Sequence, residues 1–161
     1  MLNPTIVSFT ERKVIGMKMT MSLQVNKTEN LWKSFMVRRN EIDNKIGNDL
    51  YSVQYYDSFY FKSFKPSNDF EKWACIEVTD FSLIPSGMHS LVLCAGLYAV
   101  FLYKGSSDSG SEMFNYIFNK WLPDSIYELD NLAHFEILGE KYMKNDPNSE
   151  EDIYIPIKVK V

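Results

Sequence analysis

The chain has 161 residues, of which 45% are hydrophobic and 24% charged, and a net charge of −4. This length suits one domain, residues 1–161, and the acidic balance argues against a surface that neutralises nucleic-acid phosphates. No apolar stretch is long enough for a signal peptide or a membrane span, so we expect a cytoplasmic protein without a membrane partner.

The first half of the chain predicts one strand, one helix and two further strands. Residues 11–23 alternate polar and apolar side chains, as a strand does. Apolar residues at helical spacing predict a helix over residues 28–46. Strands are expected at 50–57 and 73–80, and the segment 58–72 between them, rich in Phe and Tyr, is expected to be a loop.

The second half repeats that order. Residues 91–105 predict one strand interrupted at Gly96, or two short strands. A helix is expected over residues 106–122, and the last strands over 133–141 and 152–161.

Three residues predict the limits of this second helix. Ser109 and Glu112 have the spacing of a capping box, which marks a helix N-terminus. Pro123 is expected to end the helix, because proline lacks the backbone N–H that a helix interior needs.

The repeated order predicts an α+β fold made of tandem strand-helix-strand-strand units, in residues 10–80 and 91–161. Two such units can pair into one antiparallel sheet with both helices on one face. The other face would be left uncovered and concave, because sheets twist and curl.

Strand alternation then predicts which side chains face this concave side. If Phe135 and Ile137 face the helices, Glu136 and Leu138 face the opposite side. By the same reasoning several aromatic residues and a second carboxylate gather there, which favours a binding cleft over an idle surface. The members of this set are Trp73, Tyr56, Tyr154, Glu77 and Glu136. The alternative is that Glu136 is an ordinary strand carboxylate in open solvent.

Three segments resemble one known family. The stretches "LCAGLYAVFLYKG", "MFNYIFNKWLPDSIYELDNLAHFEILGEKY" and "EEDIYIPIKV" are similar to the GyrI-like small-molecule-binding domains. These are also the effector-binding domains of AraC-type and multidrug-responsive bacterial transcription regulators. The resemblance extends from about Glu11 to Lys158, and the second half is its specific part.

The resemblance implies a fold of two units related by a pseudo-twofold axis, with a ligand cleft between them. In that family a glutamate on the Phe-Glu strand pairs with cationic ligands, and here the matching residue is Glu136. Because the match begins near the N-terminus, we expect a stand-alone domain without a helix-turn-helix and without direct contact to DNA.

The resemblance implies a binding protein for a small, hydrophobic and cationic organic molecule. Glu136 would supply the charge, and aromatic, carboxylate and apolar side chains would enclose the ligand. We expect that enclosing set to be Trp73, Tyr98, Tyr56, Tyr154, Glu77 and Leu138. We expect no cofactor and no metal, because His134 and His89 have no further ligand at useful spacing. A homodimer is left open.

Two other functions are implied by relatives within the family. One is a hydrolase of reactive electrophiles, with Glu136 as the acid or base and Tyr98 as a helper. The other is a protein inhibitor of a DNA topoisomerase, which the modest charge of −4 favours least. Membership in a family does not choose among these roles.

Overall fold

The computed structural model describes residues 3–106 and 110–161, and these form an antiparallel sheet of nine strands with helices on its outside. The strands are β1 (Thr5–Phe9), β2 (Arg12–Met21), β3 (Lys45–Tyr55), β4 (Phe70–Val78), β5 (His89–Leu93), β6 (Gly96–Lys104), β7 (Tyr127–Leu129), β8 (His134–Leu138) and β9 (Glu150–Val159). The helices are α1 (Thr28–Met36), the 3₁₀ helix η1 (Arg39–Glu41), α2 (Gly110–Tyr116), the π-helical turn η3 (Ile117–Trp121) and α3 (Leu122–Asp124).

The strand order confirms the predicted tandem units. Along the sheet the order is β1-β6-β9-β8-β3-β4-β2-β5, with β7 beside β9, so β3 and β8 meet in the middle. At their centre Val53 pairs with Phe135. A pseudo-twofold axis through this pair relates Gln54 to Glu136, and therefore puts the two side chains on one face of the sheet.

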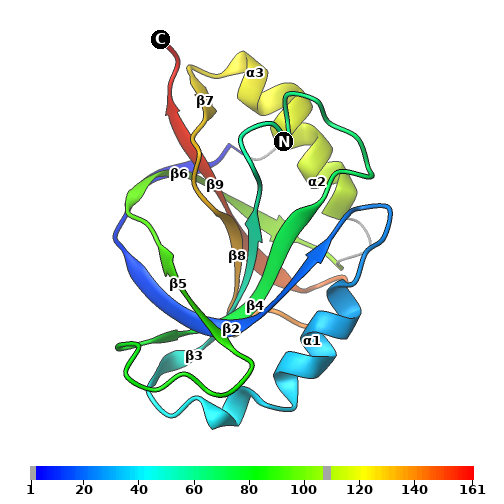
Figure 1. The fold of residues 1–161 in the computed structure, drawn as a ribbon. Coiled ribbons are helices and arrows are strands. Elements are labelled where there is room, and N and C mark those ends of the chain that lie inside the picture. Colours follow the sequence, from blue (N-terminus) through cyan, green and yellow to red (C-terminus); the bar gives the residue numbers. More distant parts are fainter. Residues whose placement is uncertain (1–2, 107–109) are drawn as a thin grey trace.

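The two ends of the sheet are joined through one continuous ribbon. Phe9 of β1 pairs with Gly96 of β6, and Arg12 of β2 pairs with Leu93 of β5, in the same register. Since β1 runs into β2 and β5 runs into β6, this ribbon belongs to both ends of the sheet. The strands therefore curl into the ring visible in Figure 1.

Strong curling requires a glycine in β2. A Cβ atom at Gly16 would lie 2.0 Å from the backbone oxygen of Ala74 and 2.5 Å from the Cβ of Cys75. Gly16 pairs with Cys75 on one side and with His89 on the other. Only glycine allows the backbones to approach so closely at this position.

Both helices cover the outer face of the sheet, on the right of the view in Figure 1. Helix α1 buries Leu31 and Phe35 against a cluster that includes Ala74 and Ile76. The segment from α2 to α3 covers a second cluster around β6 and β9. Ala74, Ile76 and Val78 of β4 belong to the first cluster, and Ile153, Ile155 and Ile157 of β9 belong to the second, so all six face the helices.

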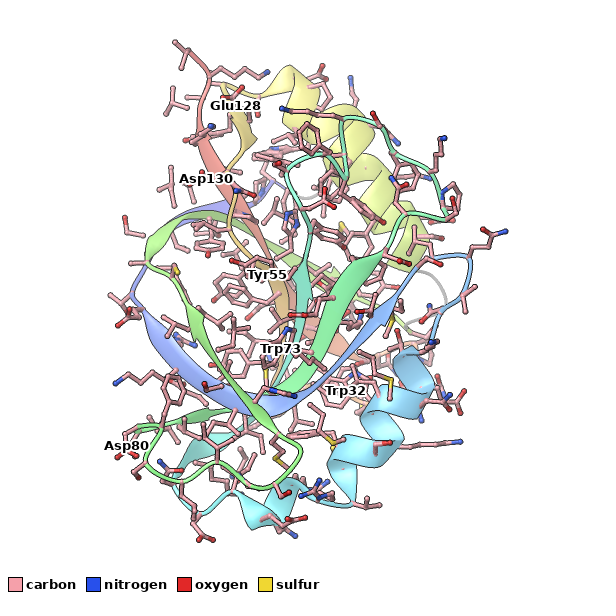
Figure 2. The ribbon with its side chains drawn as sticks, viewed as in Figure 1. Trp32, Tyr55, Trp73, Asp80, Glu128 and Asp130 are labelled. Atoms are coloured by element: carbon pink, nitrogen blue, oxygen red, sulfur yellow. The ribbon has the colours of Figure 1, made fainter. Side chains whose placement is uncertain are left out.

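The inner face of the sheet is a closed core, and this corrects the prediction for β8. Phe135 and Ile137 point inward, so Glu136, between them, faces the helices. Side chains fill the space that the strands enclose, as Figure 2 shows. The core members are Phe9, Val14, Tyr51, Val53, Trp73, Cys75, Leu93, Tyr98, Ala133, Phe135 and Ile137. The prediction failed because all five residues of β8 are buried, so apolar character does not show which face of this strand the helices cover.

Several element boundaries differ from the sequence prediction. The helix predicted over residues 28–46 ends at Met36, and β3 already begins at Lys45. Ile42 is nevertheless buried, through the short 3₁₀ turn that precedes it. The segment 91–105 forms two strands, β5 and β6, and strands β1 and β7 were not predicted from the sequence.

The second helix extends slightly beyond its predicted end. It passes through the π-helical turn and ends at Asp124, one residue after Pro123, in line with the expectation that this proline ends the helix. The predicted capping residue Ser109 lies outside the described residues. Among the described residues, no helix has both the length and the apolar character needed to cross a membrane.

Candidate functional site

Between the two helix-covered clusters, the central strands present a group of polar side chains that we call the polar seam. Its members are Ser52, Gln54, Lys72, His134, Glu136 and Glu151. The strand register explains why they share one face: Ser52 pairs with Glu136, and Gln54 pairs with both His134 and Lys72. Directly opposite residues in a sheet point to the same side. The seam therefore lies on the side of the helices.

Glu136 is the most deeply placed charge in the seam. Its residue is only 8% exposed, and its Oε2 accepts a hydrogen bond of 3.0 Å from the side-chain amide of Gln54. No lysine, arginine or histidine nitrogen in the described part of the chain lies within 4.0 Å of it. Burial raises the pKa of Glu136, and the charge of Lys72 and the Gln54 hydrogen bond only partly oppose this.

Glu151 brings a second carboxylate to the seam. It lies on β9 two residues from Ile153, which pairs with Glu136 across the strands. Such diagonal neighbours on one face are about 7–8 Å apart at their Cα atoms. Burial, and then the negative charge of Glu136, raise the pKa of Glu151 to about 7. The two carboxylates therefore repel each other when both are ionised.

His134 contributes an aromatic ring to the seam and no charge. Burial lowers the pKa of His134 to about 3, so the imidazole is neutral at physiological pH. Its ring lies 4.9 Å from Tyr56, 5.5 Å from Phe61 and 6.1 Å from Phe118, measured between centroids. Among the described residues no group of His, Cys, Asp and Glu could hold a metal ion.

Two phenylalanines from opposite sides meet over His134. Phe61 comes from the loop between β3 and β4, Phe118 comes from the π-helical turn, and their rings stack at 5.1 Å. Both side chains are only partly buried. π-Helical turns inside α-helices are frequent at functional sites, because they shift the side chains of one turn relative to the next. Here the turn places Phe118 beside the seam.

Tyr56 connects the seam with the molecular surface. Burial, followed by the charge of Glu136, strongly raises the pKa of the Tyr56 hydroxyl. Tyr56 also lines an open depression of about 430 Å³, together with Asp57, Asp69 and Glu71. Tyr55, labelled in Figure 2, lines the same depression. A larger depression, of about 850 Å³, lies along the outer side of α2, η3 and α3.

Comparison with known proteins identifies the family. Residues 2–158 match the GyrI-like small molecule binding domain. The chain belongs to this family. The GyrI-like assignment covers both units of the sheet, and it confirms the resemblance seen in the sequence.

A regulator and two solved structures are similar to this GyrI-like chain. It is 29% identical over 157 residues to the transcriptional regulator BrlR of Pseudomonas aeruginosa, and covers 56% of that protein and 97% of this chain. The chain thus spans about half the length of BrlR. The structure of SAV2435 bound to tetraphenylphosphonium has a TM-score of 0.73 at 10% identity, covering 98% of this chain and 94% of that one. The C-terminal domain of EcmrR has a TM-score of 0.73 at 17% identity, covering 99% and 100%. These structural likenesses show the fold.

In this GyrI-like chain the residues predicted for one cleft divide between the two faces of the sheet. Glu136 and Leu138 lie on the helix side, and Tyr56 lies beside them. Trp73 and Tyr98 lie in the inner core, where each has a hydrogen bond of its own: Trp73 Nε1 donates to Glu71 Oε1 at 2.7 Å, and the Tyr98 hydroxyl donates to the backbone oxygen of Cys94 at 3.3 Å.

Two other predicted residues also lie on the inner side. Tyr154 stacks on Phe135 with ring centroids 4.6 Å apart. Glu77 accepts a hydrogen bond of 3.2 Å from the hydroxyl of Tyr51, to which Arg12 donates at 2.6 Å. The set predicted as one cleft is therefore split, because the face opposite the helices is an enclosed core.

The sequence prediction missed four residues of the seam and of the rings over His134: Phe61, Phe118, Lys72 and Glu151. Phe61 lies in the segment expected to be a loop and Phe118 in the second expected helix, and sequence spacing does not show where a loop folds back. The sequence does indicate the facing of Lys72 and Glu151. Lys72 lies two residues before Ala74, and Glu151 lies two residues before Ile153, so strand alternation puts each on the same face as that residue.

Proposed function

We propose that this chain binds a small, hydrophobic, cationic organic molecule in the polar seam, with Glu136 as the carboxylate that neutralises the cation. One observation supports this most strongly. Glu136 is a buried carboxylate whose close hydrogen-bond partner is a neutral amide, with no cation within 4.0 Å in the described part of the chain. An unpaired buried carboxylate is costly, and a bound cation would remove that cost.

The aromatic rings around the seam support the choice of an organic cation. Tyr56, Phe61 and Phe118 form one connected group around the neutral ring of His134. A cation over an aromatic face gains about 0.5–2 kcal/mol for each good contact. A metal ion or a strongly hydrated cation would gain little from such rings, whereas a large cation with apolar substituents also buries its own surface.

A ligand must displace some of these rings to reach Glu136. Phe61 is suited to this, because it lies on the loop between β3 and β4, and its neighbours Phe59 and Phe64 are largely exposed. Phe118 is only partly buried as well. We propose that the two rings separate when the ligand enters and then contact it. Loops of this kind supply many of the moving parts of binding sites.

The relatives support the same function. SAV2435 has been solved bound to tetraphenylphosphonium, a hydrophobic organic cation, and BrlR is named as a transcriptional regulator. We propose that this chain likewise senses its ligand as the effector domain of a transcription regulator, whether within a longer protein or together with one.

Matched titrations test the proposed role of Glu136. Tetraphenylphosphonium and the uncharged triphenylphosphine oxide are titrated by calorimetry into the wild type and the Glu136→Gln variant. The variant should lose about 10–100-fold in affinity for the cation, equivalent to about 1.4–2.8 kcal/mol, and change little for the neutral compound. Glu128→Gln, at a partly exposed glutamate of β7, is the control. Equal losses for both compounds would overturn the charge-pairing role.

A further inference from the structure

Within residues 3–106 and 110–161, Lys72 is the one lysine that the strand register brings into the polar seam. It lies on β4 directly opposite Gln54, whose amide donates to Glu136 at 3.0 Å. Lys72 is partly buried, and its position two residues before Ala74 puts it on the helix side of the sheet. Its long side chain can therefore extend along the seam towards the carboxylates.

The ammonium group of Lys72 is close enough to act on both carboxylates but is not locked to either. Its charge lowers the pKa of Glu136 and of Glu151, against the larger effect of their burial. Among the described residues it forms no ion pair within 4.0 Å. A flexible ammonium in this position is free to move without breaking a close contact.

Other lysines form ion pairs of their own, and Lys18 lies on the opposite face of the sheet, across from Trp73 of the inner core. Lys18 pairs with Glu71 at 3.5 Å, and Lys141 pairs with Glu150 at 3.5 Å. On the helices, Lys33 pairs with Glu29 at 3.2 Å and Lys120 pairs with Asp124 at 2.8 Å, both in exposed positions. His134 is neutral because burial lowers its pKa. Among the described residues, Lys72 is therefore the cation that acts on both seam carboxylates, from beyond ion-pair distance.

We propose that Lys72 is the internal cation of the empty site, and that the positive centre of the ligand replaces it. In this account Lys72 moves to solvent when the ligand binds, and it competes with every cationic ligand. It thereby lowers the affinity of the site for cations and leaves its affinity for neutral molecules unchanged. The inference rests on the proposed function, because it assumes that the ligand's positive charge is bound in the polar seam.

The first test measures ligand affinity at pH 8.5, where Glu151 is mostly ionised. In Lys72→Met the competing charge is gone, so tetraphenylphosphonium should bind about 5–30-fold more tightly than to the wild type. Triphenylphosphine oxide should bind both proteins alike. Lys72→Arg should behave as the wild type, and Lys18→Met, which removes a lysine from another ion pair, should leave cation affinity unchanged. Equal or weaker cation binding by Lys72→Met would overturn the proposal.

The second test needs no ligand. In urea unfolding at pH 8.5, Lys72→Met should lower the midpoint of the wild type, because two buried carboxylates lose their compensating charge. In the Glu136→Gln, Glu151→Gln background the same substitution should have little effect, since coupled residues are non-additive. Equal shifts in both backgrounds would overturn the role of Lys72.

The outcomes separate the two proposals. If Glu136→Gln selectively weakens cation binding but Lys72→Met does not strengthen it, the role of Lys72 is wrong and the proposed function stands. If the wild type shows no preference for the cation, and Glu136→Gln changes nothing, the proposed function itself is wrong, and the inference fails with it.

Discussion

Two neighbouring residues of β8 belong to two different environments. Phe135 points into the enclosed core, is fully buried, and has Phe9, Tyr98 and Tyr154 rings within 5.4 Å of its own. Glu136 points to the other face, into the polar seam. The inner face has the composition of a stabilising core, and the outer face holds charges that are expensive to bury. The difference teaches that one strand can give an apolar ring to the enclosed core and, from the next residue, the carboxylate that we propose binds the ligand.

The largest expected effect on stability comes from removing the ring of Phe135 from the inner core. Phe135→Ala should lower the free energy of unfolding by about 3–5 kcal/mol, because it leaves a cavity at the centre of the aromatic core. Urea unfolding followed by circular dichroism measures this. Phe59→Ala, at a loop residue that is 69% exposed, is the matched control and should change stability by less than about 0.5 kcal/mol. Similar effects of the two substitutions would contradict the division between the faces.

The second effect is the loss of stability at acidic pH that His134 causes. The folded-state pKa of His134, about 3, is below its ordinary value of 6.5, so the unfolded chain binds the additional proton between these values. The contribution of neutral His134 to the free energy of unfolding is fully present above pH 6.5 and is lost as the pH falls towards 3. The slope from this one group is at most about 1.4 kcal/mol per pH unit.

A substitution isolates that contribution. His134→Phe keeps an aromatic ring against Tyr56, Phe61 and Phe118 but does not titrate, so its stability should fall less than that of the wild type between pH 6.5 and 4. Chemical unfolding of both proteins across this range measures the difference. If the free energies of unfolding of the two proteins fell equally with pH, His134 would not be held neutral in the folded state.

The third effect has the opposite dependence on pH and concerns Glu136. Burial raises the pKa of Glu136 above its ordinary value. Protonated Glu136 therefore makes its full contribution to the free energy of unfolding below about pH 4.5, and this contribution is lost as the pH rises through the folded-state pKa. Glu136→Gln should therefore unfold like the wild type near pH 4 and be more stable at pH 8, by on the order of 1–3 kcal/mol.

The partners of Glu136 make this prediction specific. Gln54, Lys72 and Glu151 all act on this carboxylate or respond to it, and removing its charge also relieves Glu151. Unfolding at the two pH values tests the prediction. A variant less stable than the wild type at pH 8 would show that Glu136 is retained for the fold and not for binding.

The smallest expected effect on stability comes from the ring above the seam. Phe61→Ala removes a partly buried side chain and should cost about 1 kcal/mol or less in the free energy of unfolding. It should also change the association rate of tetraphenylphosphonium by several-fold, because Phe61 stacks on Phe118 over the route to the seam. Stopped-flow fluorescence measures the rate. An unchanged rate, with unchanged affinity, would place the ligand elsewhere.

Much of the fold could be predicted from the sequence. The alternation in residues 11–23 and the repeated strand-helix-strand-strand order gave the α+β class and the paired units. In the structure Gln54 and Glu136 occupy equivalent positions of the two units, and the hydrogen bond between them agrees with the repeat. These features depend on local periodicity, which a single sequence contains.

The candidate site was predicted only in part. Glu136 is buried rather than in open solvent, but its facing was predicted the wrong way round, since both Phe135 and Glu136 become buried when the sheet curls and the helices pack. The rings over His134 come from the loop between β3 and β4 and from the π-helical turn, and Lys72 and Glu151 come from β4 and β9. Such long-range placement depends on tertiary packing, which spacing along the chain does not encode.

The ionisation of Glu136 itself is the most direct measure of the account. Carboxyl carbon shifts of Glu136, followed by NMR over a pH titration, report its pKa in the free protein and in protein saturated with tetraphenylphosphonium. We predict a raised pKa in the free protein and a clear fall when the cation is bound. A pKa that is the same in both states, with the cation demonstrably bound, would contradict the claim that this carboxylate neutralises the ligand.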